Sequence, residues 1–423
     1  MTGSRRILTG NEPLWGRIGR MRILFIAPYL PSLIRVRPFN FIKALARREH
    51  RISLLCLVQS RNEVNDLDHV ESYCEKVETV YLHRMRSIAN CLVYSPFPVS
   101  LQAAYCFSSR MNEKVTQALQ DHQFDVVHLE HIRAAHFLRS GMDVASVFDA
   151  VDCITSLYEQ FSQHKPSWLG RWTSGVEYRK LRGHEPKEAS KFDRVVVTSR
   201  KDKEDLQELA PALSVDVISN GVDMEYFRPS DGIVETASIV FSGKMSYYAN
   251  ESAATFLCDE VMPRVKASEP GATLTIAGSS PSKRIQRYAI GHGIEVTGHV
   301  PDMRVCLRNA RVAACPVSVG AGVQNKVLEA MAMGKPVVAT SKACQALSVV
   351  DGEHVLIADQ QEDFAEALVR IIRDDDLAGR LGRNGREYVD NNHNWNEKAR
   401  QLEETYSEAI ASAGARVRGH NRG

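Results

Sequence analysis

A loop with two glycines, followed by a polar helix start, holds the residues best suited to chemistry. Segment 315–340 carries Gly320 and Gly322 in the loop, and its pattern predicts a helix that starts near Val323. The glycines allow a ligand close to the backbone, and the free amides of a helix N-terminus attract an anion. Glu329, about two turns into that helix, can instead reach hydroxyl groups. The pattern therefore fits a ligand that carries both a phosphate and a sugar diol, such as a nucleotide sugar. The alternative is an ordinary strand-helix-strand unit with a polar helix start.

Short apolar runs alternate with longer amphipathic stretches along the chain. Apolar strands separated by helices indicate parallel sheets that are covered on both faces. The fold class is therefore predicted to be α/β, with two doubly wound, Rossmann-like domains and ligands in the cleft beyond the carboxyl ends of the strands. The expected strands are 22–27, 52–58, 125–129, 146–149, 194–198, 215–218, 238–241, 272–277, 294–297, 312–315, 336–340 and 355–357.

The domain limits are expected at turn and linker residues. Turn-forming residues at 220–223 and a linker at 227–232 separate two halves of similar architecture. Met21 is an alternative start, because the first strand follows it directly. The expected division is 1–20 as a loose basic extension, 21–226 and 227–392 as the two domains, 393–412 as a helix that returns to the first domain, and 413–423 as a flexible tail.

Composition excludes several classes of protein. The chain has 423 residues, 44% of them hydrophobic and 25% charged, which is typical of soluble globular domains and not of disordered chains. A net charge of +2 gives no case for nucleic-acid binding, although residues 1–51 hold eleven Lys and Arg against two acids. Nine cysteines without a Cys-x-x-Cys pair favour reduced thiols in a cytoplasmic protein. No apolar run approaches the ~18–20 residues of a membrane span.

Further segments carry a family resemblance. They are 22–28, 124–128, 195–199, 217–223 with 227–229, 240–244 and 296–298. Together with 315–340 they resemble the retaining, nucleotide-sugar-dependent glycosyltransferases of the GT-B fold, the large group called glycosyl transferases group 1 or family 4. The resemblance spans nearly all of 21–412 and implies an acceptor-side first domain that faces a nucleotide-sugar-binding second domain across a cleft.

The resemblance implies roles for residues of the second domain. Glu329 matches the second acid of a Glu-x7-Glu signature and would bind the ribose hydroxyls of the donor. Lys244, directly after Gly243, would hold the diphosphate and stabilise the leaving group, which makes it the first catalytic candidate. The remaining donor-binding candidates are Gly243, Lys326 and the backbone at Gly322, Val323, Gln324 and Asn325 for the phosphates, and Gly278 and the 298–300 turn with His299 for the base.

Three departures from the family pattern concern the donor. Ala321 stands where the first acid of the signature is expected, which leaves the donor sugar open and admits an inactive protein. Asn250 stands near a second basic position and is taken as donor-binding. The usual Gly-Gly pair of the first loop is absent. Arg35 and Arg37 occupy that loop, where they either bind a donor phosphate or an anionic acceptor or are surface charges.

Polar residues at two strand ends of the first domain are candidates for the acceptor side. Glu130 and His131 are catalytic candidates that would support the reacting sugar or orient the acceptor hydroxyl, whereas His128, still in the strand, is expected in the core. Asp152 follows the next strand and either faces the acceptor or caps a helix. The two histidines lack a third ligand, so no metal site is expected.

The sequence therefore predicts a retaining glycosyltransferase that moves a sugar from a nucleotide-diphosphate sugar to a saccharide, lipid-linked or small-molecule acceptor, as in polysaccharide or glycoconjugate biosynthesis. No metal and no cofactor are expected, because Lys244 and the helix start would carry the diphosphate charge. A nucleotide-sugar epimerase of the same fold and an inactive nucleotide-sugar-binding scaffold protein remain as alternatives.

The basic leading end suggests where the protein works. It is expected in the cytoplasm, with peripheral attachment to the inner face of an anionic membrane as a further expectation. Residues 5–20 would tether the chain, and Lys43, Arg47 and Arg48 lie on a predicted helix that can face a membrane carrying a lipid-linked acceptor.

Overall fold

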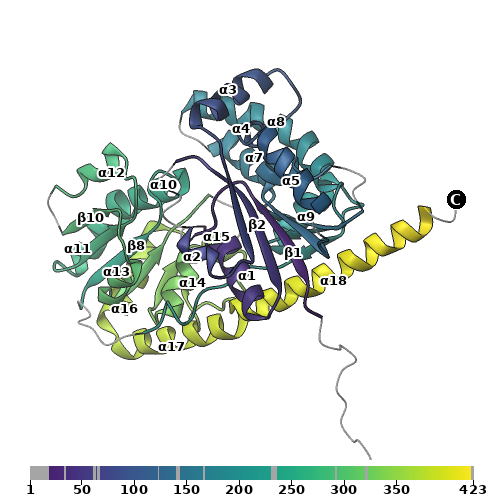
Figure 1. The fold of residues 1–423 in the computed structure, drawn as a ribbon. Helices are drawn as coiled ribbons and strands as arrows, with labels where there is room; N and C mark the ends of the chain where they lie inside the picture. Colours follow the sequence, from purple (N-terminus) through teal and green to yellow (C-terminus); the bar gives the residue numbers. More distant parts are fainter. Residues whose placement is uncertain are drawn as a thin grey trace, which may run out of the picture.

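Two parallel β-sheets form the framework of the computed structural model (Figure 1). The structure describes residues 19–32, 35–60, 63, 67–121, 123–139, 143–164, 167–229, 236–290, 293–319 and 323–420. The strand order is β3-β2-β1-β4-β5-β6-β7 in the first sheet and β10-β9-β8-β11-β12-β13 in the second. The predicted fold class, two doubly wound α/β domains, is confirmed.

The first domain contains β1 to β7 and α1 to α9. Its strands are β1 (Arg22–Ala27), β2 (Arg51–Val58), β3 (Lys76–Tyr81), β4 (Val126–Glu130), β5 (Ala145–Val151), β6 (Arg194–Val197) and β7 (Val215–Val217). Its helices are α1 (Val36–Arg47), α2 (Asp68–Glu71), α3 (Arg84–Tyr94), α4 (Leu101–Tyr105), α5 (Ser109–Asp121), α6 (Ile132–Ala135), α7 (Ile154–His164), α8 (Trp168–Ala189) and α9 (Arg200–Leu209).

The second domain contains β8 to β13. Its strands are β8 (Ser238–Ser242), β9 (Thr273–Ala277), β10 (Ile294–Gly298), β11 (Val312–Cys315), β12 (Val337–Ala339) and β13 (Leu356–Ile357). Its helices are α10 (Tyr248–Phe256), continued by a π-turn (Leu257–Val261), then α11 (Met262–Ser268), α12 (Lys283–Arg287), α13 (Met303–Asn309), α14 (Asn325–Ala332), α15 (Ser341–Cys344), α16 (Gln361–Arg373) and α17 (Asp375–Asn392). The long helix α18 (Trp395–His420) follows.

The central strands are buried along nearly their whole length and are mostly apolar, because helices cover both faces of each sheet. In β1, Leu24 and Ile26 belong to one core of the first domain, whereas Ile23 and Phe25 belong to the other. The edge strand β3 alternates polar and apolar residues, as half-exposed strands do, and its sequence therefore lacked the apolar run that predicted its neighbours.

Helix α18 crosses back from the second domain to the first (Figure 1). Trp395, Leu402 and Tyr406 on this helix are buried in the core formed with β1 and α1. On another side of the molecule, Tyr248 of α10 donates a hydrogen bond from its hydroxyl to the His164 carbonyl at the end of α7 (2.9 Å). The two domains are thus joined at separate places, and the carboxyl ends of their strands lie between.

Candidate active site

Two glycines bring the end of β8 against the end of β9. Gly243 has a φ of +151° and Gly278 a φ of +145°. A Cβ atom added to Gly278 would lie 1.8 Å from the carbonyl oxygen of Gly243, so no residue with a side chain fits there. Lys244 follows directly; it is exposed, and its ammonium makes no hydrogen bond to a described residue. Backbone atoms without side chains are therefore exposed at Gly243 and Gly278, and the Lys244 ammonium follows them in the chain. We refer to these three residues as the corner.

A second cation reaches this corner from α14. Lys326 donates from Nζ to Asn250 Oδ1 (2.5 Å) and lies 5.1 Å from the centre of the Phe241 ring. Asn250 in turn donates from Nδ2 to the carbonyl oxygen of Lys244 (3.0 Å). Burial lowers the pKa of the Lys326 ammonium. Asn250 stands where the family resemblance expects a basic residue, and it positions a lysine from a different helix at the same corner.

Helix α14 presents a carboxylate three residues beyond that lysine. Residues three apart lie on one face of a helix, so Lys326 and Glu329 are neighbours. Burial raises the pKa of Glu329 to about 7, and the nearby Lys326 opposes that rise. Gln324 precedes the helix without making a side-chain cap, so no side chain in the described structure occupies the first-turn amides. Val323 packs in the core, and Gly322 and Ala321 lie outside the described residues.

The backbone continues from Gly278 to the turn after β10. The amide of Gly278 donates to the carbonyl of Gly298 (3.1 Å), whose φ is +69°. His299 comes next and is exposed. The turn proposed for the base of a nucleotide therefore lies directly beside the corner proposed for the phosphates.

His131 and Glu130 adjoin at the end of β4 but have different surroundings. The Nδ1 atom of His131 accepts from the amide of Arg133 (3.3 Å), so the ring proton is on Nε2, which has no partner among the described residues. Burial and the Arg133 charge hold the pKa of His131 well below its usual range, so the imidazole is neutral. Glu130 is 2% exposed, and burial raises its pKa to about 8. The Tyr29 hydroxyl donates to Glu130 Oε1 (2.6 Å), whereas Oε2 has no partner in the described structure.

His131 can thus donate one hydrogen bond from a neutral ring. Glu130 is a buried acid that is protonated at neutral pH, because a pKa of about 8 lies above 7. His128 is in the core, where it stacks on Phe25 with ring centres 4.0 Å apart.

Arg37 is buried and does not face a ligand. Its side chain is 5% exposed; Nε donates to Asp149 Oδ2 (2.7 Å), and one terminal nitrogen donates to the Ile218 carbonyl and to Asn220 Oδ1 (both 2.9 Å). This placement corrects the expectation that Arg37 binds an anionic ligand or is a surface charge. The physical reason is that the Asp149 carboxylate is buried in the same place and needs a counter-charge.

Asn220 is a site residue that the sequence identified only as part of a turn. Its Oδ1 accepts from Arg37, and its Nδ2 donates to Asn325 Oδ1 at the start of α14 (3.1 Å). The Asn220 carbonyl also accepts from His393 Nδ1 (2.8 Å). Asn220 therefore connects the first domain, the donor helix and the segment before α18. No local sequence signal could reveal this, because its partners are far away in the chain.

Arg35 and Asp152 remain at the boundary between the domains. Arg35 is exposed, and its guanidinium lies 4.3 Å from the centre of the Tyr29 ring. Asp152 accepts from the Thr198 hydroxyl (3.1 Å), and burial together with a neighbouring carboxylate raises its pKa to about 7. Burial, and after it the nearby Asp152 carboxylate, raise the pKa of the second-domain Tyr247 to about 12.

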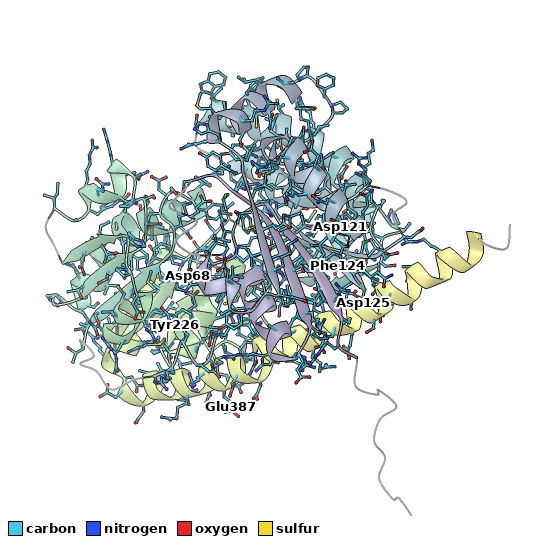
Figure 2. All side chains as sticks on the ribbon, viewed as in Figure 1. Asp68, Asp121, Phe124, Asp125, Tyr226 and Glu387 are labelled. Carbon is cyan, nitrogen blue, oxygen red and sulfur yellow. The ribbon has the colours of Figure 1, made fainter. Side chains whose placement is uncertain are left out.

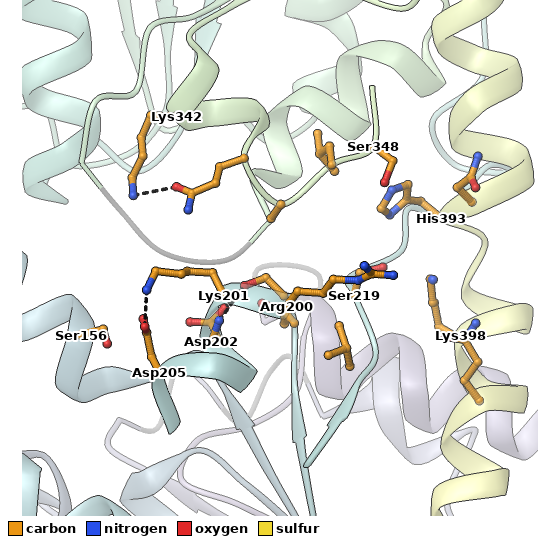
Figure 3. A pocket seen from close by; sticks show the side chains of 18 of the residues that line it. Ser156, Arg200, Lys201, Asp202, Asp205, Ser219, Lys342, Ser348, His393 and Lys398 are labelled. Atoms are coloured by element: carbon orange, nitrogen blue, oxygen red, sulfur yellow. Dashed lines mark hydrogen bonds and ion pairs between the residues drawn. The ribbon is translucent and has the colours of Figure 1, made fainter. Parts of the chain in front are cut away.

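A cavity of about 460 Å³ lies between the domains (Figure 3). Its walls include Thr198 and Arg200 of the first domain, Lys342 of α15 and Lys398 of α18. Lys398 is 7% exposed, its ammonium makes no hydrogen bond to a described residue, and Figure 3 shows it directed at the cavity. Burial lowers the pKa of Lys398. Arg200 and Lys398 carry no local sequence signal that distinguishes them from surface charges.

The basic residues of α1 pair with acids of the same chain. Lys43 donates to Asp223 (2.6 Å), and Arg48 makes two bonds to Glu403 (2.5 and 2.8 Å). Arg47 lies 3.5 Å from Glu225, and both of these side chains are exposed. The structure gives no support to the expectation that this helix faces a membrane. Of the predicted tether 5–20, residues 5–18 lie outside the described part of the chain.

Two searches of the described residues gave no candidates. No helix among them is long and apolar enough to span a bilayer. No group of three His, Cys, Asp or Glu among them is arranged to hold a metal ion.

Comparison with solved structures defines the class of the fold. A sucrose-phosphate synthase of Thermosynechococcus elongatus superposes with a TM-score of 0.71 at 18% identity, covering 93% of this chain and 100% of that one. The Anabaena protein HepE in complex with UDP-glucose superposes with a TM-score of 0.67 at 14% identity, covering 92% and 100%. The two facing Rossmann-like domains are those of the GT-B glycosyltransferases.

Sequence comparison identifies the family. The model of Glycosyltransferase Family 4 matches residues 36–226, and that of Glycosyl transferases group 1 matches residues 236–374. The chain is 25% identical to the glycogen synthase of Mycobacterium tuberculosis over 298 residues, which is 67% of this chain and 68% of that protein. It is also 25% identical to the phosphatidyl-myo-inositol mannosyltransferase of Mycobacterium leprae over 322 residues, or 74% and 80%. The protein belongs to the family 4, group 1 glycosyltransferases.

Proposed function

We propose that this glycosyltransferase takes a sugar from a nucleotide-diphosphate sugar and transfers it with retention of the anomeric configuration. The observation that carries the proposal is the corner of β8 and α14. There Lys244 and Lys326 supply two cations, and Glu329 supplies a carboxylate on the same helix face as Lys326. Two cations suit a diphosphate, and a carboxylate suits the two hydroxyls of a ribose.

The transfer step uses these charges as follows. The bond between the anomeric carbon and the phosphate oxygen breaks, and the nucleoside diphosphate leaves. The acceptor oxygen bonds to the anomeric carbon on the same face, and its proton passes to the leaving phosphate oxygen. Negative charge grows on the leaving group, where Lys244, Lys326 and the first amides of α14 stabilise it. No metal is required in this scheme.

His131 would contribute from the first domain. Its ring is neutral, and Nε2–H is available as a hydrogen-bond donor. A donor at that position can hold a hydroxyl of the transferred sugar while the anomeric bond breaks. Glu130 is less suited to direct contact, because its side chain is buried beneath Tyr29.

The acceptor would occupy the interdomain cavity. Arg200, Lys342 and Lys398 on its walls favour an acceptor that carries a phosphate or a carboxylate. The names of two relatives, a glycogen synthase and a phosphatidyl-myo-inositol mannosyltransferase, cover a polysaccharide and a lipid acceptor. Both acceptor classes remain part of the proposal.

Donor hydrolysis tests the proposal. The protein should release a nucleoside diphosphate from one member of a nucleotide-sugar panel, and the released sugar or product should keep the anomeric configuration by NMR. Glu329→Gln should weaken binding of that donor about tenfold or more, whereas Glu366→Gln, at an exposed position of α16, should not. An isomeric nucleotide sugar would indicate an epimerase, and binding without any turnover would indicate a scaffold. Inversion of configuration would refute the retaining mechanism.

A further inference from the structure

The first domain exposes large apolar side chains at one end, around α3 and the start of α8. Seven of them are between 52% and 72% exposed: Met85, Leu92, Val93, Phe97, Trp168, Leu169 and Trp172. We refer to these seven residues as the α3–α8 apolar surface. Figure 1 places both helices at the same end of the molecule, and Figure 2 shows side chains projecting outward there. Single exposed apolar residues are ordinary, but a group of this size marks a surface that binds something.

Helix α3 has its polarity reversed relative to an ordinary surface helix. The residues that it buries are Ser87 and Asn90, and Asn90 donates to the Phe107 carbonyl (2.9 Å). Met85 and Leu92 lie seven residues apart on a face that points away from the domain. The apolar face therefore points outward, while Asn90 anchors the buried side through one hydrogen bond.

The start of α8 belongs to the same surface. Ser167 caps the helix, and Trp168 and Trp172 are four residues apart, so they share a face. Further along α8, Lys180 donates from Nζ to the Ser95 carbonyl directly after α3 (2.7 Å). This contact links α8 to the end of α3, and the apolar side chains of both helices lie at the same end of the domain.

The charged side chains of the segment that carries α3 have one sign. No Asp or Glu occurs between Glu78 and Glu113, whereas Arg84 and Arg86 at the start of α3 are exposed. Neither basic side chain has an ion-pair partner among the described residues. The first acid of α8, Glu177, is buried and accepts from the amides of Leu101 and Gln102. The headgroup region of an anionic lipid bilayer binds tryptophan, aliphatic side chains and arginine at the same time.

We propose that the α3–α8 apolar surface docks the protein on an anionic phospholipid bilayer. Helix α3 follows β3, and α7 and α8 follow β5, so the surface lies on the side of the domain where the strands end and the cleft opens. A docked molecule would bring the mouth of its cleft near the lipid surface. This orientation suits an acceptor attached to a lipid, and that last consequence rests on the proposed function.

Vesicle sedimentation of the full chain tests the proposal. The wild type should bind vesicles that contain phosphatidylglycerol, and bind vesicles of phosphatidylcholine alone more weakly. The triple variant Leu92→Ser/Trp168→Ser/Trp172→Ser should lose at least tenfold in binding. The matched control Ile290→Ser/Val350→Ser removes exposed apolar side chains from the second domain and should bind as the wild type does. Arg84→Gln/Arg86→Gln should remove most of the preference for the anionic lipid.

Tryptophan emission gives an independent readout. The chain has four tryptophans; Trp395 is buried, so in a Trp15→Phe background a blue shift on adding vesicles reports Trp168 and Trp172. Equal vesicle binding by the wild type and the triple variant would overturn the proposal. So would failure of the wild type to bind any vesicle, or a concentration-dependent dimer that the triple variant abolishes.

Donor hydrolysis separates this inference from the proposed function. The triple variant should hydrolyse the free donor at the wild-type rate, because its substitutions lie outside the donor site. Vesicle binding without donor hydrolysis by the wild type would refute the proposed function and leave the docking surface standing. Hydrolysis without vesicle binding would refute the docking surface alone.

Discussion

Replacing Lys326 by methionine should weaken donor binding while it stabilises the free protein. Asn250 holds the ammonium of Lys326 at the proposed diphosphate corner, at 2.5 Å, in the free protein. Folding has therefore already removed this charge from water, and the lowered pKa of Lys326 shows the direction of that cost. Methionine has a similar length and carries no charge, so the free protein should unfold at a higher temperature.

The effect on the donor follows from the lost charge. A hydrogen bond from a charged donor contributes about 1.5–3 kcal/mol, and the diphosphate would lose one such partner. A loss of about 2 kcal/mol corresponds to an about 30-fold higher Kd for the donor. The free energy of desolvating the Lys326 ammonium does not offset this loss of donor affinity. The wild-type protein has already desolvated that ammonium on folding, before the donor binds.

Titration calorimetry and thermal unfolding measure the two effects on the same samples. The control is Lys335→Met, which removes a half-buried lysine that donates to the carbonyls of Arg308 and Ala310 and contacts neither Asn250 nor Lys326. This variant should leave the donor Kd unchanged. Unchanged donor affinity in Lys326→Met, together with a lower unfolding temperature, would refute the placement of the diphosphate at this corner.

Three further outcomes are expected. Donor affinity should rise with pH up to about 7 and then level off, because the ribose hydroxyls require the ionised form of Glu329, whose pKa is raised to about 7. Calorimetry across pH should show this rise, and Glu329→Gln should remove it. Gly278→Ala should destabilise the fold by about 2–4 kcal/mol in denaturant unfolding, since its Cβ would meet a carbonyl oxygen at 1.8 Å, whereas Gly271→Ala has open space and should not. Arg37→Met should lower the free energy of unfolding by about 3–5 kcal/mol, because it leaves the buried Asp149 carboxylate unpaired. Arg35→Met should change the free energy of unfolding by less than about 0.5 kcal/mol. Equal effects of the two substitutions would contradict the assignment of Arg37 to the interior.

Part of the site followed directly from local sequence. Gly243 and Lys244 directly follow β8, and the family resemblance of segment 240–244 marked them as donor-binding candidates without a structure. The same holds for Lys326 and Glu329, because a spacing of three residues on a helix fixes their common face. His131 was found for the same reason, as a polar residue directly after β4.

The partners of these residues could not be predicted in this way. Asn250 and Lys326 are 76 positions apart, Arg37 and Asp149 are 112 apart, and Lys43 and Asp223 are 180 apart. A basic residue in a loop or on a helix has the same local pattern whether it faces a ligand, a membrane or a buried acid. The sequence therefore could not show that Arg37 pairs with a buried acid, or that the basic residues of α1 pair with acids of the same chain.

The sequence by itself determined the fold class, and it predicted two domains around a cleft and the glycine, lysine and glutamate positions of the proposed donor site. These features depend on hydrophobic periodicity and on residues that are neighbours in the chain. Only the tertiary structure decided which charges are free. Lys244 and Lys398 have no described partners, Arg37 is neutralised in the interior, and the apolar side chains of α3 point outward. Burial and pairing depend on segments that meet only when the chain has folded, and these contacts decide which residues remain available to a ligand or a membrane.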